Sequence, residues 1–155
     1  MAEATLKSKP IVKALHAAFC RDAGRAEILK LAATKMRATG PPYTSVYLYM
    51  IDESGETLLL EAFDGRETEH TSIPLGRGLC GKAITERADL NVPDVSAAPE
   101  YLPCNIDTRS ELIVLIRRNE EILGQIDIDS DAPNGFDGME QAAVKEVADA
   151  LAVLL

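Results

Sequence analysis

The start of the chain has apolar residues at the spacing of helices. They fall into two stretches, Ile11, Leu15, Ala18 and Phe19 in the first, and Ile28, Leu29, Ala32, Ala33 and Met36 in the second. Pro10 can open the first helix, Gly24 breaks the pattern, and Gly40-Pro41-Pro42 ends the second. Two helices are therefore expected ahead of the double proline, with Cys20 packed beside Phe19 at the end of the first.

The spacing of apolar residues then changes to two, which is typical of strands. Strands are expected at 45–50, 57–63, 112–116 and 122–128, with a short extended piece at 72–75. Turn residues at 52–55 and 117–120 make hairpins of the two pairs. A short helix is expected at 79–87, an irregular segment at 91–105, and a last helix after Asp137, which can cap it.

This order of elements predicts an α+β fold, because hairpins give an antiparallel sheet and the helices are segregated from it. With 155 residues, of which 46% are hydrophobic, the chain is expected to form one domain over 1–155, with residues 1–9 as a disordered tail. The apolar end Val153-Leu154-Leu155 indicates either a helical dimer interface or a truncated chain, and a homodimer is expected.

The net charge of −9 argues against a nucleic acid or an anionic membrane as a partner. No apolar run approaches membrane-spanning length, and no signal peptide is visible, so a cytoplasmic location is expected. The three cysteines do not form the even set of a disulfide scaffold. His16 and His70 are far apart in the sequence, which does not favour a zinc site.

Several motifs together resemble the GAF domain family. They are Gly78-Leu79-Cys80-Gly81-Lys82-Ala83, Val92-Pro93-Asp94-Val95-Ser96, Thr108-Arg109-Ser110-Glu111-Leu112 and Ile122-Leu123-Gly124-Gln125-Ile126-Asp127-Ile128-Asp129-Ser130. The resemblance covers roughly residues 10–155 and implies a GAF/PAS-like fold. Such a fold has a central antiparallel sheet of five to six strands, with the N- and C-terminal helices on one face and a ligand-binding face opposite.

Within that family, the chain is most similar to the free methionine-(R)-sulfoxide reductases. The resemblance implies that Cys104 is the nucleophile, that Cys80 resolves the intermediate, and that Glu111, Asp127 and Asp129 bind the free amino acid. Tyr49 matches a tyrosine of those enzymes at the substrate site. His70 lies near the place of a third family cysteine, and Ser45 stands where the family has a tryptophan.

The reductase reaction needs a thiolate, a proton donor and a second thiol, restored by a thioredoxin-like reductant. It requires no metal and no organic cofactor. Asp127 or Glu111 can hold the proton if partly buried. The start of a helix at Cys80 favours its thiolate, because the helix dipole stabilises a negative charge.

Each of these residues also has a structural interpretation. Cys104 can pack beneath Pro103, Cys80 can fill a helix-to-sheet contact, and Glu111 can pair with Arg109. Asp127 and Asp129, two apart on a strand, can belong to an ordinary solvated face. A non-catalytic GAF sensor that binds a small metabolite or nucleotide is therefore the alternative function.

Overall fold

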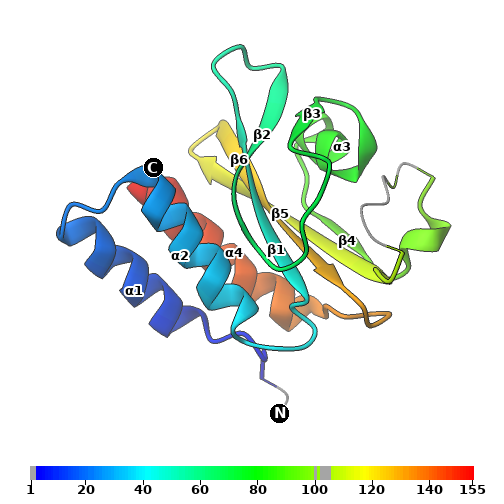
Figure 1. Ribbon diagram of the computed structural model, residues 1–155, viewed down its shortest axis with the longest axis horizontal. Helices are drawn as coiled ribbons and strands as arrows, with labels where there is room; N and C mark the ends of the chain where they lie inside the picture. The colour runs from blue at the N-terminus through cyan, green and yellow to red at the C-terminus, as the bar shows by residue number, and fades with distance from the viewer. Residues whose placement is uncertain (1–2, 100, 102–105) are drawn as a thin grey trace.

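The structure of the protein is a computed structural model, which describes residues 3–99, 101 and 106–155. Its helices are α1 (Ser8–Cys20), α2 (Arg25–Arg37), α3 (Gly78–Glu86) and α4 (Gly138–Leu154), with a 3₁₀ turn η1 (Val95–Ala97). Its strands are β1 (Ser45–Ile51), β2 (Thr57–Asp64), β3 (Ser72–Pro74), β4 (Leu90–Val92), β5 (Ser110–Arg118) and β6 (Glu121–Ser130). The strands form one antiparallel sheet in the order β3-β2-β1-β6-β5-β4 (Figure 1).

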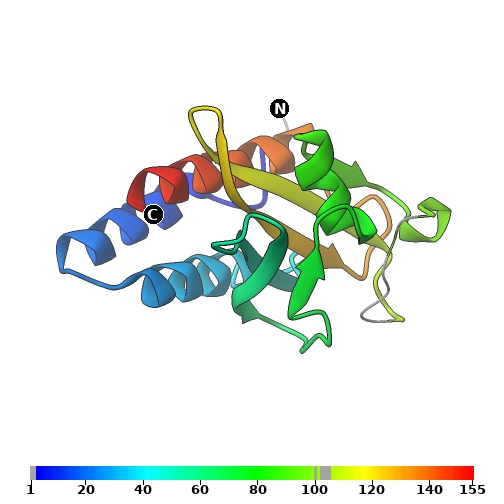
Figure 2. The ribbon, with the colours of Figure 1, turned by 90° about the horizontal axis from the view of Figure 1, so that it is seen from above.

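The two faces of this sheet carry different layers. Helices α1, α2 and α4 cover one face, and α3 lies on the opposite side (Figures 1 and 2). Alternation along β1 explains the division, because Val46 and Leu48 pack beneath the three helices whereas Tyr47 and Tyr49 face the α3 side. The predicted α+β fold, with terminal helices on one face of an antiparallel sheet, is confirmed.

Strand β5 lies inside the sheet between β4 and β6, and both of its faces are buried. Leu112, Val114 and Ile116 join the core under the helices, while Ile113 and Leu115 join the smaller core under α3. A continuous apolar run, as at 112–116, is typical of a strand that is buried on both faces. Strand β4, which pairs with β5, was expected to be irregular. It is only three residues long, too short for an alternating pattern to stand out.

The N-terminal segment is attached to the last helix through a buried carboxylate. Glu140 on α4 accepts hydrogen bonds from the backbone nitrogens of Thr5 and Leu6 and from the hydroxyl of Tyr43. The side chain of Leu6 is buried, and α1 begins at Ser8, within the segment that was expected to be a tail. At the start of α4, Asp137 accepts hydrogen bonds from Met139 and Glu140, which confirms the predicted cap.

The end of α1 differs from the expectation. Phe19 is 49% exposed and Cys20 is exposed as well, so neither packs into the core. The buried residues of α1 are Ile11, Leu15 and Ala18. Among the described residues, none of the helices has the length and the apolar character needed to cross a membrane.

Candidate functional site

Three carboxylates lie on the sheet face that α3 covers. Asp127 and Asp129 alternate with Ile126 and Ile128 along β6, and Glu111 on β5 is directly opposite Asp129 in the register of the sheet. All three are buried, with exposures of 5% for Glu111, 5% for Asp127 and 3% for Asp129. The interpretation of β6 as an ordinary solvated face is therefore wrong, because α3 and its flanking segments cover these side chains.

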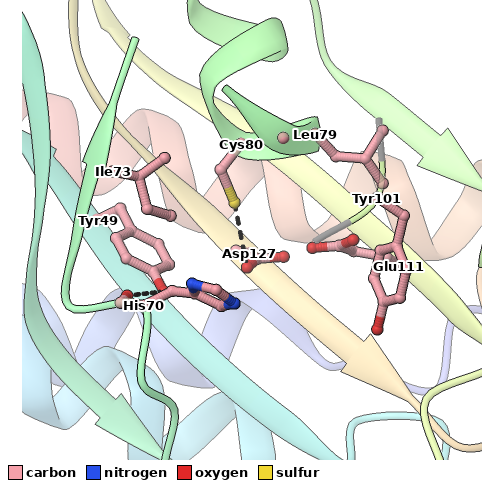
Figure 3. Close-up of a pocket in the computed structure, with 9 residues that line it drawn as sticks. Tyr49, His70, Ile73, Leu79, Cys80, Tyr101, Glu111 and Asp127 are labelled. Carbon is pink, nitrogen blue, oxygen red and sulfur yellow. Dashed lines mark hydrogen bonds between the residues drawn. The ribbon is translucent and has the colours of Figure 1, made fainter. Parts of the chain in front are cut away.

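Helix α3 places Cys80 over this carboxylate face. The Sγ atom of Cys80 donates a hydrogen bond to Oδ2 of Asp127 at 3.3 Å (Figure 3). The side-chain amide of Gln125 on β6 donates to the carbonyl oxygen of Cys80 at 2.9 Å, which fixes the first turn of the helix to the sheet. The thiol is thus held against β6 by a backbone contact as well as by its own side chain.

Glycines allow the tight approach of α3. Gly76 and Gly78 have φ values of +88° and +66°, in the left-handed region that other residues rarely adopt. A Cβ at Gly81 would lie 2.7 Å from the nitrogen of Gly76 and 2.9 Å from the carbonyl oxygen of Pro74. The Gly-rich sequence before and within α3 is therefore a packing requirement that seats Cys80.

A small cavity separates α3 from the sheet, and its volume is about 30 Å³. The residues that line it come from β1, β3, α3, β5, β6 and the segments before β3 and before β5: Tyr49, His70, Ile73, Gly78, Leu79, Cys80, Tyr101, Glu111 and Asp127. That space holds about one water molecule and is far smaller than typical ligand pockets of roughly 300–1,000 Å³. An amino acid can bind here only if the lining side chains move apart.

Burial dominates the electrostatics of the site. It raises the pKa of the Cys80 thiol well above 9.0, and the negative charges of Asp127 and Glu111 raise it further. The expectation that the helix dipole favours a Cys80 thiolate is therefore wrong, because burial and two carboxylates outweigh it. Burial likewise raises the pKa of Asp127 above 3.8, and interactions with Glu111 and Cys80 only partly oppose this shift.

The structure brings together most of the residues singled out from the sequence. Cys80, Glu111, Asp127 and Tyr49 line one cavity, and Asp129 lies next to it on β6. The hydroxyl of Tyr49 donates to the carbonyl oxygen of His70 at 2.6 Å, which ties β1 to the segment before β3. Cys104, the expected nucleophile, lies outside the described residues.

Other cavity residues gave no signal of function in the sequence. From the sequence, His70 was considered as a zinc ligand, which was not favoured, and for its place near a family cysteine; its side chain borders the cavity opposite Tyr101 (Figure 3). Ile73 and Leu79 are apolar lining residues of the kind that any core contains. Ser45, which stands where the family has a tryptophan, is not among the lining residues; it is buried, and its hydroxyl accepts a hydrogen bond from the backbone nitrogen of Arg66 at 2.9 Å.

These features define an α+β domain in which a six-stranded antiparallel sheet bears helices on one face and, on the other, a small cavity lined by a thiol and two buried carboxylates. The chain belongs to the GAF domain family, whose model matches residues 25–155.

The curated relatives include a protein named only for its GAF domain and a protein named as an enzyme. The chain is 33% identical over 102 residues to GAF domain-containing protein A of Dictyostelium discoideum, covering 66% of this chain and 63% of that protein. It is 32% identical over 117 residues to the free methionine-R-sulfoxide reductase of Saccharomyces cerevisiae, covering 75% of this chain and 64% of the enzyme. The matches thus span less than two thirds of these relatives' own length.

Solved structures share the fold across nearly the whole chain. A type II free methionine-R-sulfoxide reductase from Thermoplasma acidophilum is 33% identical with a TM-score of 0.77, covering 93% of this chain and 94% of that chain. The GAF domain of an Acinetobacter phosphoenolpyruvate-protein phosphotransferase is 20% identical with a TM-score of 0.83, covering 97% and 89%. The second likeness shows the fold alone, because one fold can serve many functions.

Proposed function

We propose that this protein reduces free methionine-(R)-sulfoxide, with thiols as the source of electrons. The observation that carries the proposal is the meeting of a thiol, Cys80, with two buried carboxylates, Glu111 and Asp127, in one cavity. The similarity to the Thermoplasma acidophilum and yeast reductases supports it. Burying several carboxylates together is unfavourable unless a proton neutralises them or a cation pairs with them. The ammonium group of a free amino acid is such a cation.

In the proposed reaction, the thiolate of Cys104 attacks the sulfur of the sulfoxide. The S–O bond breaks, the oxygen passes to Cys104 as a sulfenic acid, and methionine leaves. The Cys80 thiol then attacks the sulfur of the sulfenic acid, forming an S–S bond and releasing water. A thioredoxin-like reductant supplies two electrons and two protons to restore both thiols, as expected in a reducing cytoplasm.

Asp127 is suited to serve as the acid and then as the base of this sequence. Because burial raises its pKa, it keeps a proton to a higher pH than an exposed aspartate and can give it to the sulfoxide oxygen. The carboxylate left behind accepts a hydrogen bond from the Cys80 thiol, so it is placed to take that proton when Cys80 attacks. This matters because the buried Cys80 thiol does not ionise readily by itself.

The test is consumption of free L-methionine-(R)-sulfoxide by the purified protein with dithiothreitol or a thioredoxin system. Turnover should disappear in Cys104→Ser and persist in Cys20→Ser, since Cys20 is exposed on α1 away from the cavity. In Cys80→Ser, the first turnover should persist with dithiothreitol while the thioredoxin-dependent cycle slows. Unchanged turnover in Cys104→Ser would remove that residue from the reaction and the proposal with it.

A non-catalytic GAF sensor is the second candidate. The protonated, buried state of Cys80 favours it, because such a thiol is poorly reactive. Thermal stabilisation by a metabolite that the protein does not turn over, together with the absence of sulfoxide reduction, would replace the reductase by this function.

A further inference from the structure

Three side chains in the cavity offer metal-ligating atoms to the same point. The sulfur of Cys80, a carboxylate oxygen of Glu111 and a carboxylate oxygen of Asp127 all lie within 4.8 Å of one another. They come from α3, β5 and β6, and all three residues are buried. Figure 3 shows the three side chains converging from these elements. Packing thus fixes the donors around a common centre.

One carboxylate oxygen of Asp127 at this centre lacks a hydrogen-bond partner among the residues that the structure describes. This atom, Oδ1, is buried. Asp127 also takes part in none of the ion pairs found among those residues. A buried carboxylate oxygen that borders a cavity and lacks a partner is a position for a cation.

We propose that Cys80, Glu111 and Asp127 form a binding site for a divalent transition-metal ion of the zinc type. The ion would be held by one sulfur and two carboxylate oxygens, with its fourth position open to water. Zinc accepts sulfur and oxygen ligands in tetrahedral geometry and commonly keeps an open position in three-ligand sites. The site uses neither His16 nor His70.

The distances in the cluster suit such an ion. With Zn–S at about 2.3 Å and Zn–O at about 2.1 Å, a tetrahedral angle places the two ligand atoms about 3.6 Å apart. The Sγ of Cys80 and Oδ2 of Asp127 are 3.3 Å apart, so a small rotation of the side chains accommodates the metal. The cavity, at about 30 Å³, adds room for the single water of the fourth position.

Metal binding would displace protons, because a thiol ligates as thiolate and a carboxylic acid as carboxylate. The proton of Cys80 and any proton on Asp127 pass to solvent, so affinity for the metal should rise with pH. The ion would also occupy the carboxylates that are proposed to bind the amino acid. Competition between metal and sulfoxide is therefore expected, and this consequence, unlike the metal site itself, rests on the proposed function.

The experiment uses a variant in which Cys80 is the only cysteine, made by Cys20→Ser and Cys104→Ser. After treatment with a chelator, it is titrated with Zn²⁺ by calorimetry and in competition with a chromophoric chelator. One equivalent should bind. Co²⁺ in its place should show the sulfur-to-cobalt charge-transfer absorption of a thiolate ligand, which a carboxylate-only surface site lacks.

Adding Cys80→Ser or Asp127→Asn to this variant should weaken binding by roughly 100-fold or more, since even outer-shell partners of metal ligands are worth about 10–100-fold. Asp131→Asn is the control, because Asp131 pairs with Arg66 at the surface and should leave binding unchanged. Circular dichroism and thermal melting establish that each variant is folded. If Cys80→Ser misfolds, the test of the site is the loss of affinity in Asp127→Asn, together with the cobalt spectrum of the variant that retains Cys80.

Absence of one-equivalent binding, or equal affinity with and without Cys80 and Asp127, would overturn the metal site. Turnover of the sulfoxide by the wild-type protein is measured separately in metal-free buffer. Zinc binding without turnover would remove the reductase and keep the site. Turnover that zinc does not inhibit, in a protein that does not bind zinc, would remove the metal site and keep the reductase.

Discussion

The thiol of Cys80 donates a hydrogen bond to Oδ2 of Asp127 across 3.3 Å, and both side chains are buried between α3 and the sheet. Burial makes ionisation of both groups harder, because a buried charge loses its hydration, whereas the hydrogen bond from the thiol partly favours the ionised Asp127. Burial raises both pKa values, and the carboxylate raises that of the thiol further. The fold therefore disfavours the ionised form of both groups relative to the same groups in water.

Asp127→Asn should stabilise the protein at neutral pH. The pKa of Asp127 in the folded state is raised above 3.8, so the folded state favours the neutral acid, and stability is lost as pH rises through the folded pKa. Asparagine removes this loss, worth about 1.4 kcal/mol for each unit of the pKa difference. Urea unfolding of both proteins from acid to neutral pH measures the difference, which should shrink toward pH 3.8 and vanish below it.

Asp131→Asn is a control that should change the stability at neutral pH in the opposite direction, toward lower stability. Its partner Arg66 lowers the pKa of Asp131, so this carboxylate contributes stability above pH 3.8 that is lost as pH falls through the folded pKa. At neutral pH the variant should lose less than about 1 kcal/mol, because the ion pair is well exposed. Equal effects of the two substitutions would show that burial does not govern Asp127.

Cys20 and Cys80 should react with a disulfide reagent at different rates, because one thiol is exposed and the other is buried. In Cys104→Ser, Cys20 is exposed and Cys80 is buried with a raised pKa. A disulfide reagent should therefore modify one thiol fast and the second slowly at neutral pH, with both reacting together after unfolding. Adding Asp127→Asn should speed the slow phase, because a negative charge beside the thiol is removed. Two fast phases in the folded Cys104→Ser protein would contradict the burial of Cys80.

Hydrophobic spacing in the sequence predicted much of the fold. The alternation of Val46 and Leu48 with Tyr47 and Tyr49 was enough to predict a strand at 45–50, where the structure has β1, and Asp137 was recognisable as a cap. The depth of the site was less predictable. Alternation tells which strand residues share a face, but not that α3 covers that face, since this depends on contacts between segments distant in the chain.

The state of Cys80 shows the same limit. From the sequence, its place at the start of a helix favours a thiolate through the dipole, which is a local effect. In the structure, Asp127 lies 47 residues away along the chain and meets the thiol only because β6 runs beneath α3. Burial and this carboxylate together outweigh the helix end. Local motifs located the candidate residues, and long-range packing determined their protonation.

Gly81→Ala should destabilise the protein and displace the site. The added methyl group would meet the backbone of Gly76 and Pro74 at 2.7 Å and 2.9 Å, and backbone atoms cannot rotate away. We expect a loss of about 1–3 kcal/mol in the free energy of unfolding. Gly138→Ala is the matched control, because nothing lies within 4 Å of its added Cβ and alanine favours the helix by about 0.5–1 kcal/mol. Chemical denaturation measures both.

Loss of stability in Gly81→Ala should be accompanied by faster reaction of Cys80 with a disulfide reagent, since α3 carries both residues. A variant as stable as the wild type, with an unchanged slow thiol, would show that the loop at Gly76 yields and that close packing does not seat the helix.

Glu140 is expected to hold the N-terminal segment against α4. It accepts hydrogen bonds from the hydroxyl of Tyr43 at 2.7 Å, from the nitrogen of Leu6 at 3.2 Å and from the nitrogen of Thr5. Tyr43→Phe removes one donor and should cost about 1–2 kcal/mol. Glu140→Ala leaves buried donors without an acceptor and should cost more, about 2–4 kcal/mol, because a buried polar group without a partner is unfavourable.

Hydrogen exchange separates this role from a general loss of stability. In Glu140→Ala, the amides of Thr5 and Leu6 should lose protection first, while those of β5 and β6 exchange only with global unfolding. Glu146→Ala, also on α4, is the control, because its contact with Ser8 is exposed and should contribute less than about 1 kcal/mol. If Glu140→Ala and Glu146→Ala gave the same protection at Leu6, the buried carboxylate would not be what attaches the segment, and the apolar burial of Leu6 alone would account for its position.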